Sequence, residues 1–424
     1  MKVVDSGMSA TSSGDDAALR YETAMRHLLP GRTQQQLLAA CLWEGDAAAS
    51  AWSDFASAVG EPKGYFEADQ SGLKGLLPFV GSQLMANGID PGREFQTYAR
   101  VALVREELRS RICGEILGSV LVALGAAEIS AVLLKGGALS ATVYPQPSAR
   151  HNHAIDLLVD DTQMAAASRV LRELQFAPGS PGAGAAWHQD YRHWTGLALG
   201  LHSRPFFLPH FDMARDGILA RARSVEIGST TARVMSPEDS LVHVCGHATY
   251  SRSRANLRWA CDAFYLIQGN PALDWQRIIR SADAARVASQ LFVLLGWLKD
   301  ALGVSIPASV LAELRNRSRN LDPVIVEGMF ASLLHTRMSW ARALECCRGD
   351  RRLVLEFLRF SVLPSPLYLR WRYNSGSGQN WRLPFYYVRR PVRFAVSLVR
   401  RHLHRAGQSE VAGDNALSSE GAAR

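Results

Sequence analysis

The stretch AVLLKGGA at residues 131–138, followed by AIDLLV at 154–159 and LALGLH at 197–202, decides the fold of this chain. The apolar composition of Ala131–Leu134 predicts a buried strand. The turn Lys135-Gly136-Gly137 that follows lets backbone N–H groups approach a ligand closely. Residues 137–143 then predict a short helix, and the N-terminus of a helix favours an anion.

The second apolar stretch predicts another strand over Ala154–Val159. Side chains alternate across a strand, so Asp156 should lie on the face opposite Ile155 and Leu157. A carboxylate beside a Gly-rich turn gives the parts of a phosphate and metal site.

The third stretch belongs to a predicted hairpin of strands 187–194 and 197–202, joined at Thr195-Gly196. Between the second strand and this hairpin, Asp161 or Thr162 is expected to cap a helix that continues to Leu174. The order strand, helix, strand, helix, hairpin indicates a small mixed sheet and therefore an α+β fold.

Helical patterns precede the sheet, from about residue 21 to 125. Thr33 and Asp46 are expected to cap two helices, and Asp90-Pro91 has the N-cap and N1 residues of a third. The third helix is predicted to be amphipathic, with an apolar stripe at Phe95, Tyr98, Val101, Val104, Leu108, Ile112 and Ile116. We interpret Arg105, Arg109 and Arg111 as a solvated face.

Helical patterns also follow the sheet. Ser236-Pro237-Glu238-Asp239 combines an N-cap, a proline at N1 and two acids in the first turn. Further helices are expected around Leu257–Ile267, 278–302, 310–314 and 324–344. His243 and His247 have metal-ligand spacing but no third ligand, so we interpret them as buried, hydrogen-bonded histidines.

The composition is that of a folded protein with two or three domains in 424 residues and a net charge of +8. The six cysteines form no CxxC pair, which favours reduced thiols in the cytoplasm. The polar start of the chain does not resemble a signal peptide, and no apolar window is long and uninterrupted enough to span a bilayer. We expect a cytoplasmic protein, with peripheral membrane association left open.

The positive charge is concentrated near the C-terminus, where residues 357–409 contain no Asp or Glu and interleave arginines with aromatic residues. Three interpretations remain for this segment. We rank solvated or packed arginines first, an anionic membrane surface second and nucleic acid third.

Several separated motifs resemble the bacterial uncharacterised nucleotidyltransferase family of the DNA polymerase β superfamily. They are Leu134-Lys135-Gly136, Tyr144-Pro145, Arg150, Asp156-Leu157-Leu158-Val159, Leu201-His202, Pro237-Glu238-Asp239, His247 and Arg258-Trp259 with Asp262. The resemblance extends from the first helices to Leu266. It implies a nucleotidyltransferase domain flanked by helices.

The resemblance also implies a mechanism in which two Mg²⁺ ions are held by three carboxylates. The first two form an Asp-x-Asp on one strand, and the third lies on a neighbouring strand. In this chain Ala154 stands at the first position, and Gly200 precedes Leu201-His202 where the family tends to have an acid. Asp156 is the one expected ligand that remains.

Two functions follow. The first is transfer of a nucleoside monophosphate from a nucleoside triphosphate to an unknown hydroxyl acceptor, with Asp156 as the catalytic metal ligand for Mg²⁺. Lys135, Gly136, Gly137 and Arg150 would bind the nucleotide, and His153 and His202 are possible substrate or metal contacts. The second is a catalytically inactive relative that binds a nucleotide or a partner, so whether the chain is an enzyme stays open.

The expected organisation has six parts. They are a disordered tail (1–20), a helical domain (21–128), the nucleotidyltransferase-like domain (129–235), a second helical domain (236–345), the basic aromatic segment (346–406) and a disordered tail (407–424).

Overall fold

The computed structural model describes residues 18–19, 21–69, 72–179, 187–206, 211, 213–228, 230–249, 257–319, 369, 381–389 and 392. The chain divides into two compact units, residues 1–329 and 330–424. The predicted C-terminal tail, the helix predicted at 324–344 and most of the basic aromatic segment lie outside the described residues. The same holds for part of the loop that follows Pro178. Of the predicted N-terminal tail only residues 18–19 are described, and they are helical.

Helices form the start of the first unit, as predicted. They are α2 (Arg32–Leu42), α3 (Gly45–Val59), α4 (Pro62–Ala68), η1 (Leu73–Leu76), α5 (Leu77–Ala86) and the long α6 (Arg93–Ala126). The predicted caps were misplaced: α2 follows Gly31 rather than Thr33, and α3 follows Glu44. Helix α6 begins at Arg93 and has Gly92 as its N-cap. The Asp90 carboxylate accepts from the N–H of Gly92 at 2.9 Å, so it does not cap the helix.

The apolar stripe predicted for α6 is only partly buried. Phe95 is buried, but Val101, Val104, Leu108 and Ile112 are about half exposed. The face that packs inward instead carries Phe95, Ala99, Leu103, Glu106, Leu117, Val120 and Leu124. A buried glutamate on that face is a polar residue that hydrophobic periodicity could not assign to the core.

A seven-stranded mixed sheet follows, in the order β3-β4-β5-β2-β1-β7-β6. Its strands are β1 (Val132–Leu133), β2 (Ala154–Leu158), β3 (Phe176–Pro178), β4 (His188–His193), β5 (Ala198–His202), β6 (Arg223–Ile227) and β7 (Thr230–Val234). The predicted strands and the 187–202 hairpin are confirmed, with Gly196 at a φ of 90° in the turn. Sequence analysis missed β3 and the β6–β7 hairpin, whose residues are largely exposed or half-buried.

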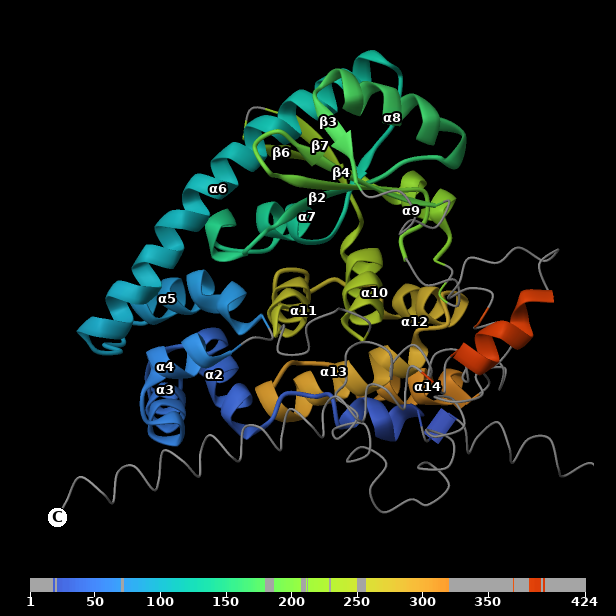
Figure 1. Ribbon diagram of the computed structural model, residues 1–424. Coiled ribbons are helices and arrows are strands. Elements are labelled where there is room, and N and C mark those ends of the chain that lie inside the picture. Colours follow the sequence, from blue (N-terminus) through green and yellow to red (C-terminus); the bar gives the residue numbers. More distant parts are fainter. Residues whose placement is uncertain are drawn as a thin grey trace, which may run out of the picture. The chain divides into compact units, whose positions relative to one another are not determined.

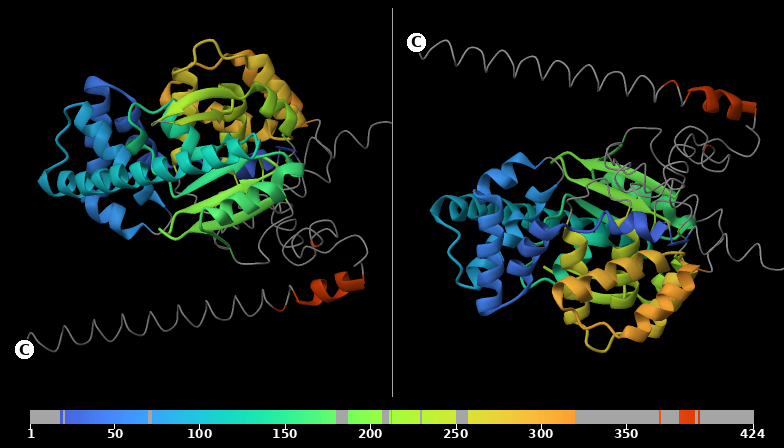
Figure 2. Two further views of the ribbon diagram at one scale, coloured as in Figure 1. Left: turned by 90° about the horizontal axis from the view of Figure 1, so that it is seen from above. Right: turned by 90° about the horizontal axis from the view of Figure 1, so that it is seen from below.

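The two faces of the sheet differ. One face packs under α6 and α8 (Met164–Glu173), where the core includes Val120 of α6 together with Leu157 and Leu201. Figures 1 and 2 show α6 crossing over this face, while α7 (Lys135–Thr142) lies on the other side. Since side chains alternate, Asp156 and His202 lie on the face opposite Leu157 and Leu201. The face with the acid is therefore the one with α7.

The rest of the unit is helical, with α9 (Arg215–Arg221), α10 (Pro237–Ala248), α11 (Arg258–Gln268), α12 (Trp275–Ala284), α13 (Ala288–Leu302) and α14 (Ala308–Arg319). The predicted start of α10 is confirmed, because the Ser236 side chain accepts from the N–H of Asp239. No helix among the described residues is long and apolar enough to cross a membrane.

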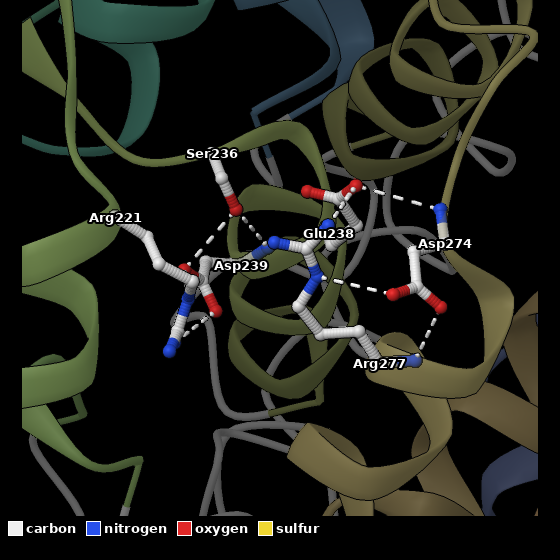
Figure 3. A network of polar contacts seen from close by, with 6 residues as sticks. All are labelled: Arg221, Ser236, Glu238, Asp239, Asp274 and Arg277. Atoms are coloured by element: carbon white, nitrogen blue, oxygen red, sulfur yellow. Dashed lines mark hydrogen bonds and ion pairs between the residues drawn. The ribbon is translucent and has the colours of Figure 1, made fainter.

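The first turn of α10 joins neighbouring elements (Figure 3). The guanidinium of Arg221, at the end of α9, donates twice to the buried carboxylate of Asp239, both at 2.9 Å. Glu238 accepts from Arg277 of α12 at 3.0 Å. The two acids that mark this helix start in the sequence thus fasten α10 to α9 and α12.

Candidate functional site

Three residues from separate elements meet on the face of the sheet that α7 covers. Asp156 projects from β2, Lys135 begins α7 directly after β1, and His202 ends β5, which pairs in parallel with β2. One oxygen of Asp156, Oδ1, accepts from Lys135 Nζ at 2.6 Å and lies 2.8 Å from His202 Nε2. Lys135 has a positive φ of 52°, an uncommon conformation for a residue with a Cβ. The structure therefore brings Lys135, Asp156 and His202 into contact.

The contacts fix the charge states at this centre. Burial by itself would raise the pKa of Asp156, but the Lys135 ammonium and the His202 hydrogen bond outweigh it and hold that pKa well below its usual range. Burial, followed by the nearby Lys135 charge, lowers the pKa of His202 to about 4. Near neutral pH the centre therefore contains a carboxylate, an ammonium and a neutral imidazole.

Gly200 lies directly beside Asp156 on the neighbouring strand, since the two are paired in register. A Cβ at Gly200 would lie 2.8 Å from His202 Nε2 and 2.9 Å from Asp156 Oδ1. Such distances are shorter than real Cβ contacts, so the imidazole of His202 fills the space that a side chain at 200 would need. Ala154 of β2 is likewise paired in register with Ala198 of β5, so neither of these two positions carries a carboxylate.

His188 and Asp190 of β4 lie on the same face of the sheet as Asp156 and His202, and sequence analysis did not select them. His188 pairs with His202 and Asp190 with Gly200 across the β4–β5 hairpin. His188 Nδ1 lies 3.1 Å from His202 Nδ1, and His188 Nε2 lies 2.8 Å from Asp190 Oδ1. The hairpin register could have found them, because residues 188 and 190 share a face with residue 200.

An ionised carboxylate only accepts, so His202 donates from Nε2 to Asp156 and is left with an accepting Nδ1. His188 Nδ1 lies 3.1 Å from that nitrogen, within hydrogen-bond distance.

Arg150 forms an ion pair with Asp262 of α11. Its guanidinium donates to both oxygens of Asp262, at 2.8 and 2.9 Å, and Tyr144 also donates to Asp262 at 2.7 Å. The Asp262 carboxylate therefore holds the segment before β2 against α11. The Arg150 side chain is 11% exposed. Its predicted contact with a nucleotide stays a prediction.

The two glycines after Lys135 are closely packed. A Cβ at Gly136 would lie 2.1 Å from Asn152 Oδ1 and 2.9 Å from Arg150 Nη1, and one at Gly137 would lie 3.2 Å from Leu133 Cδ1. A side chain at 136 would therefore displace the ends of Asn152 and Arg150, whereas one at 137 would need only a small shift of Leu133.

The segment 151–153 is held from α6. The buried Glu106 carboxylate lies 2.6 Å from His151 Nδ1 and accepts from the N–H of Asn152 at 2.9 Å. His153 stacks on His151, with ring centroids 6.0 Å apart. The buried acid on α6 therefore positions the residues that lead into β2, and His153 lies at that approach to the site.

His243 and His247 lie on α10, next to this centre. His243 Nε2 is 3.0 Å from the carbonyl oxygen of Pro205, which agrees with a buried, hydrogen-bonded histidine. Burial, followed by the Lys135 charge, lowers the pKa of His243 to about 4, and that of His247 falls well below its usual value.

The donor set does not fit the magnesium site that the resemblance implies. Mg²⁺ prefers oxygen ligands and carboxylates, whereas Asp156 is bound by two nitrogen donors, Lys135 and His202. No group of three or more His, Cys, Asp or Glu side chains that could hold a metal occurs in the described ranges. Asp160 is engaged elsewhere, because it accepts from the N–H of Thr162 and caps η3 (Asp161–Gln163). The cap had been predicted one or two residues later.

Residues 70–303, just over half of the 424, match the family model described as uncharacterised nucleotidyltransferase. A search of the curated proteins finds no match. Among solved structures, a similar chain is an antigenic nucleotidyltransferase-like protein from Paracoccidioides brasiliensis. It shares 18% sequence identity, with a TM-score of 0.31, over 46% of this chain and 94% of that chain.

Proposed function

The chain belongs to the uncharacterised nucleotidyltransferase family, and we propose that it is a nucleotide-binding member that does not use two-metal transfer. Its ligand would be a nucleoside triphosphate, bound beside Lys135 without a bridging Mg²⁺. This is the second of the two functions inferred from the sequence. Membership of the DNA polymerase β superfamily remains an expectation.

The observation that carries this proposal is the 2.6 Å ion pair between Lys135 Nζ and Asp156 Oδ1. Two-metal transfer needs several carboxylates facing the same pair of ions. Here Asp156 is already neutralised by an ammonium, Ala154 offers no oxygen, and His202 closes the space at Gly200. A metal would have to displace Lys135 and would then find a single carboxylate.

The charge of Lys135 also supports an anionic ligand. Its side chain is 25% exposed, so this cation is only partly shielded from solvent. The ammonium lies at the first turn of α7, where N–H groups without intrahelical partners favour negative charge. A phosphate there would share Lys135 with Asp156, whereas Arg150 remains paired with Asp262.

Isothermal titration calorimetry with each nucleoside triphosphate, in EDTA and in Mg²⁺, tests the proposal. We expect EDTA-insensitive binding that weakens on substitution Lys135→Gln. The matched control is Lys63→Gln, because Lys63 forms a 2.6 Å ion pair with Glu94 on other elements. Equal binding by both variants, or no binding by the native protein, would contradict the proposal.

A second assay follows transfer of labelled α-phosphate in Mg²⁺ or Mn²⁺ to a hydroxyl acceptor. We expect no transfer above the level of the Asp156→Ala variant. Metal-dependent transfer that this substitution abolishes would instead establish the first function, with Asp156 as the catalytic metal ligand.

A further inference from the structure

A second surface lies in the C-terminal unit, where residues 381–389 are helical and Val392 is helical as well. Figure 1 draws this segment in red. Trp381, Phe385, Val388 and Val392 are 73%, 62%, 69% and 58% exposed. Trp381, Phe385 and Val388 are spaced by four and three residues, which places them on one side of the helix at 381–389, and Val392 follows at the next step of four. The helix thus presents a narrow apolar stripe to solvent.

The charge around this stripe is of one sign. Residues 357–409 contain ten arginines and no Asp or Glu, and these ten charges exceed the net charge of +8 of the whole chain. Arg382 and Arg389 follow Trp381 and Val388 directly, so they lie beside the stripe. The guanidinium of Arg382 lies 4.9 Å from the centroid of the Trp381 ring.

We propose that this helical segment binds the surface of an anionic lipid membrane. A helix with an apolar face flanked by cationic side chains lies in the membrane interface, with its apolar side chains among the acyl chains. Arginine stems can extend along that apolar surface while the guanidinium groups reach lipid phosphates. Negatively charged lipids attract such basic segments.

The composition of the stripe favours lipid over nucleic acid. Bases stack on aromatic rings, and two of the four exposed side chains, Val388 and Val392, are aliphatic and offer no stacking surface. The charge also disfavours a second copy of the same helix, because residues 357–409 contain no acid that could pair with the arginines of the copy. An anionic lipid surface satisfies both the apolar stripe and its flanking charge.

Co-sedimentation of the full-length protein with phosphatidylcholine vesicles, with and without phosphatidylserine, tests this proposal. We expect binding only to the phosphatidylserine vesicles, and release when the salt concentration is raised. Substitution of both Arg382 and Arg389 by Gln should weaken binding by roughly 25-fold, at about fivefold for each basic side chain near the surface. Phe385→Asp combined with Val388→Asp should abolish it.

The matched control replaces two apolar side chains of α6 that are also about half exposed, Val101→Asp with Leu108→Asp. This control should bind vesicles like the native protein, and circular dichroism should show that all variants remain folded. Absence of vesicle binding would overturn the proposal. An equal loss of vesicle binding in the α6 control would also overturn it. The same holds if the protein binds a single-stranded oligonucleotide and the Phe385→Asp, Val388→Asp variant loses that binding but still binds vesicles.

Discussion

Replacement of Gly200 by alanine adds one methyl group at the most crowded point of the candidate site. The new Cβ would lie 2.8 Å from His202 Nε2 and 2.9 Å from Asp156 Oδ1. Replacement of glycine by alanine normally stabilises the folded protein by about 0.4–1 kcal/mol where the backbone does not require glycine, because alanine reduces the conformational freedom of the unfolded chain. Gly200 has no positive φ, so only the crowding can reverse that sign.

The magnitude follows from the two short contacts. Insertion of a methyl group into a packed region typically costs about 1–3 kcal/mol, and the methyl group here also separates His202 from Asp156. We therefore expect Gly200→Ala to lower the free energy of unfolding by about 1–3 kcal/mol. In a His202→Ala background the same substitution should cost less, because one of the two short contacts has been removed.

Urea unfolding followed by circular dichroism measures both effects as a double-mutant cycle. Gly125→Ala in α6 is the control, since nothing lies within 4 Å of the methyl group that it adds. That control should stabilise the protein by about 1 kcal/mol, as expected for an exposed helical glycine. The conclusion that His202 fills the space beside residue 200 is refuted if Gly200→Ala is as stable as the native protein. It is also refuted if the effects of Gly200→Ala and His202→Ala are additive.

Two further predictions concern buried charges. Asp262→Ala should lower the free energy of unfolding, measured in urea, by about 3–5 kcal/mol, because Arg150 is left buried without its carboxylate. A loss below about 1 kcal/mol would contradict the conclusion that Arg150 and Asp262 form a buried ion pair. The second concerns pH. His202 and His243 have pKa values of about 4 against an ordinary 6.5, so the unfolded chain takes up protons that the folded protein does not. Their contribution to stability is complete above pH 6.5 and is lost as the pH falls towards 4, by about 3 kcal/mol at most for each histidine. Urea midpoints that stay constant from about pH 7 to 5 would show that these rings are not held neutral by burial.

The part of the site built by neighbouring strands was predictable from the sequence. The apolar runs placed β1, β2 and β5, and period-two alternation placed Asp156 on the face away from the core. The structure adds the order β5-β2-β1, which brings Lys135 and His202 to that acid. Local composition succeeds here because the contacts follow from strand pairing.

The contacts that sequence analysis missed depend on elements far apart in the chain. Asp262 lies 112 residues from Arg150, and Glu106 lies 45 residues from His151. Neither acid differs in its local pattern from an ordinary polar residue on a helix. Their partners are set by how α6 and α11 pack, which helical periodicity does not determine.

The apolar stripe predicted for α6 is a case in which the residues were identified but their burial was wrong. Val101, Val104, Leu108 and Ile112 recur at helical spacing, yet they are about half exposed while Glu106 is buried. Periodicity identifies which residues share a face, but it does not identify which face a neighbour covers. The two polar contacts of Glu106 with the segment before β2 compensate for its burial and orient the helix.

The absence of a side chain at residue 200 is linked to the position of the His202 imidazole, which occupies the space beside it. With His202 in its present rotamer, an acid at 200 would collide with both the imidazole and Asp156. If the imidazole turned away, Asp156 would lose a donor and its second donor, Lys135, would still occupy the same oxygen. Acids introduced at 154 and 200 should therefore not create a metal site by themselves. The Lys135–Asp156 pair must also open and the imidazole must leave the space at 200, so a variant with both acids, Lys135→Ala and His202→Ala is the smallest change that we expect to bind Mn²⁺.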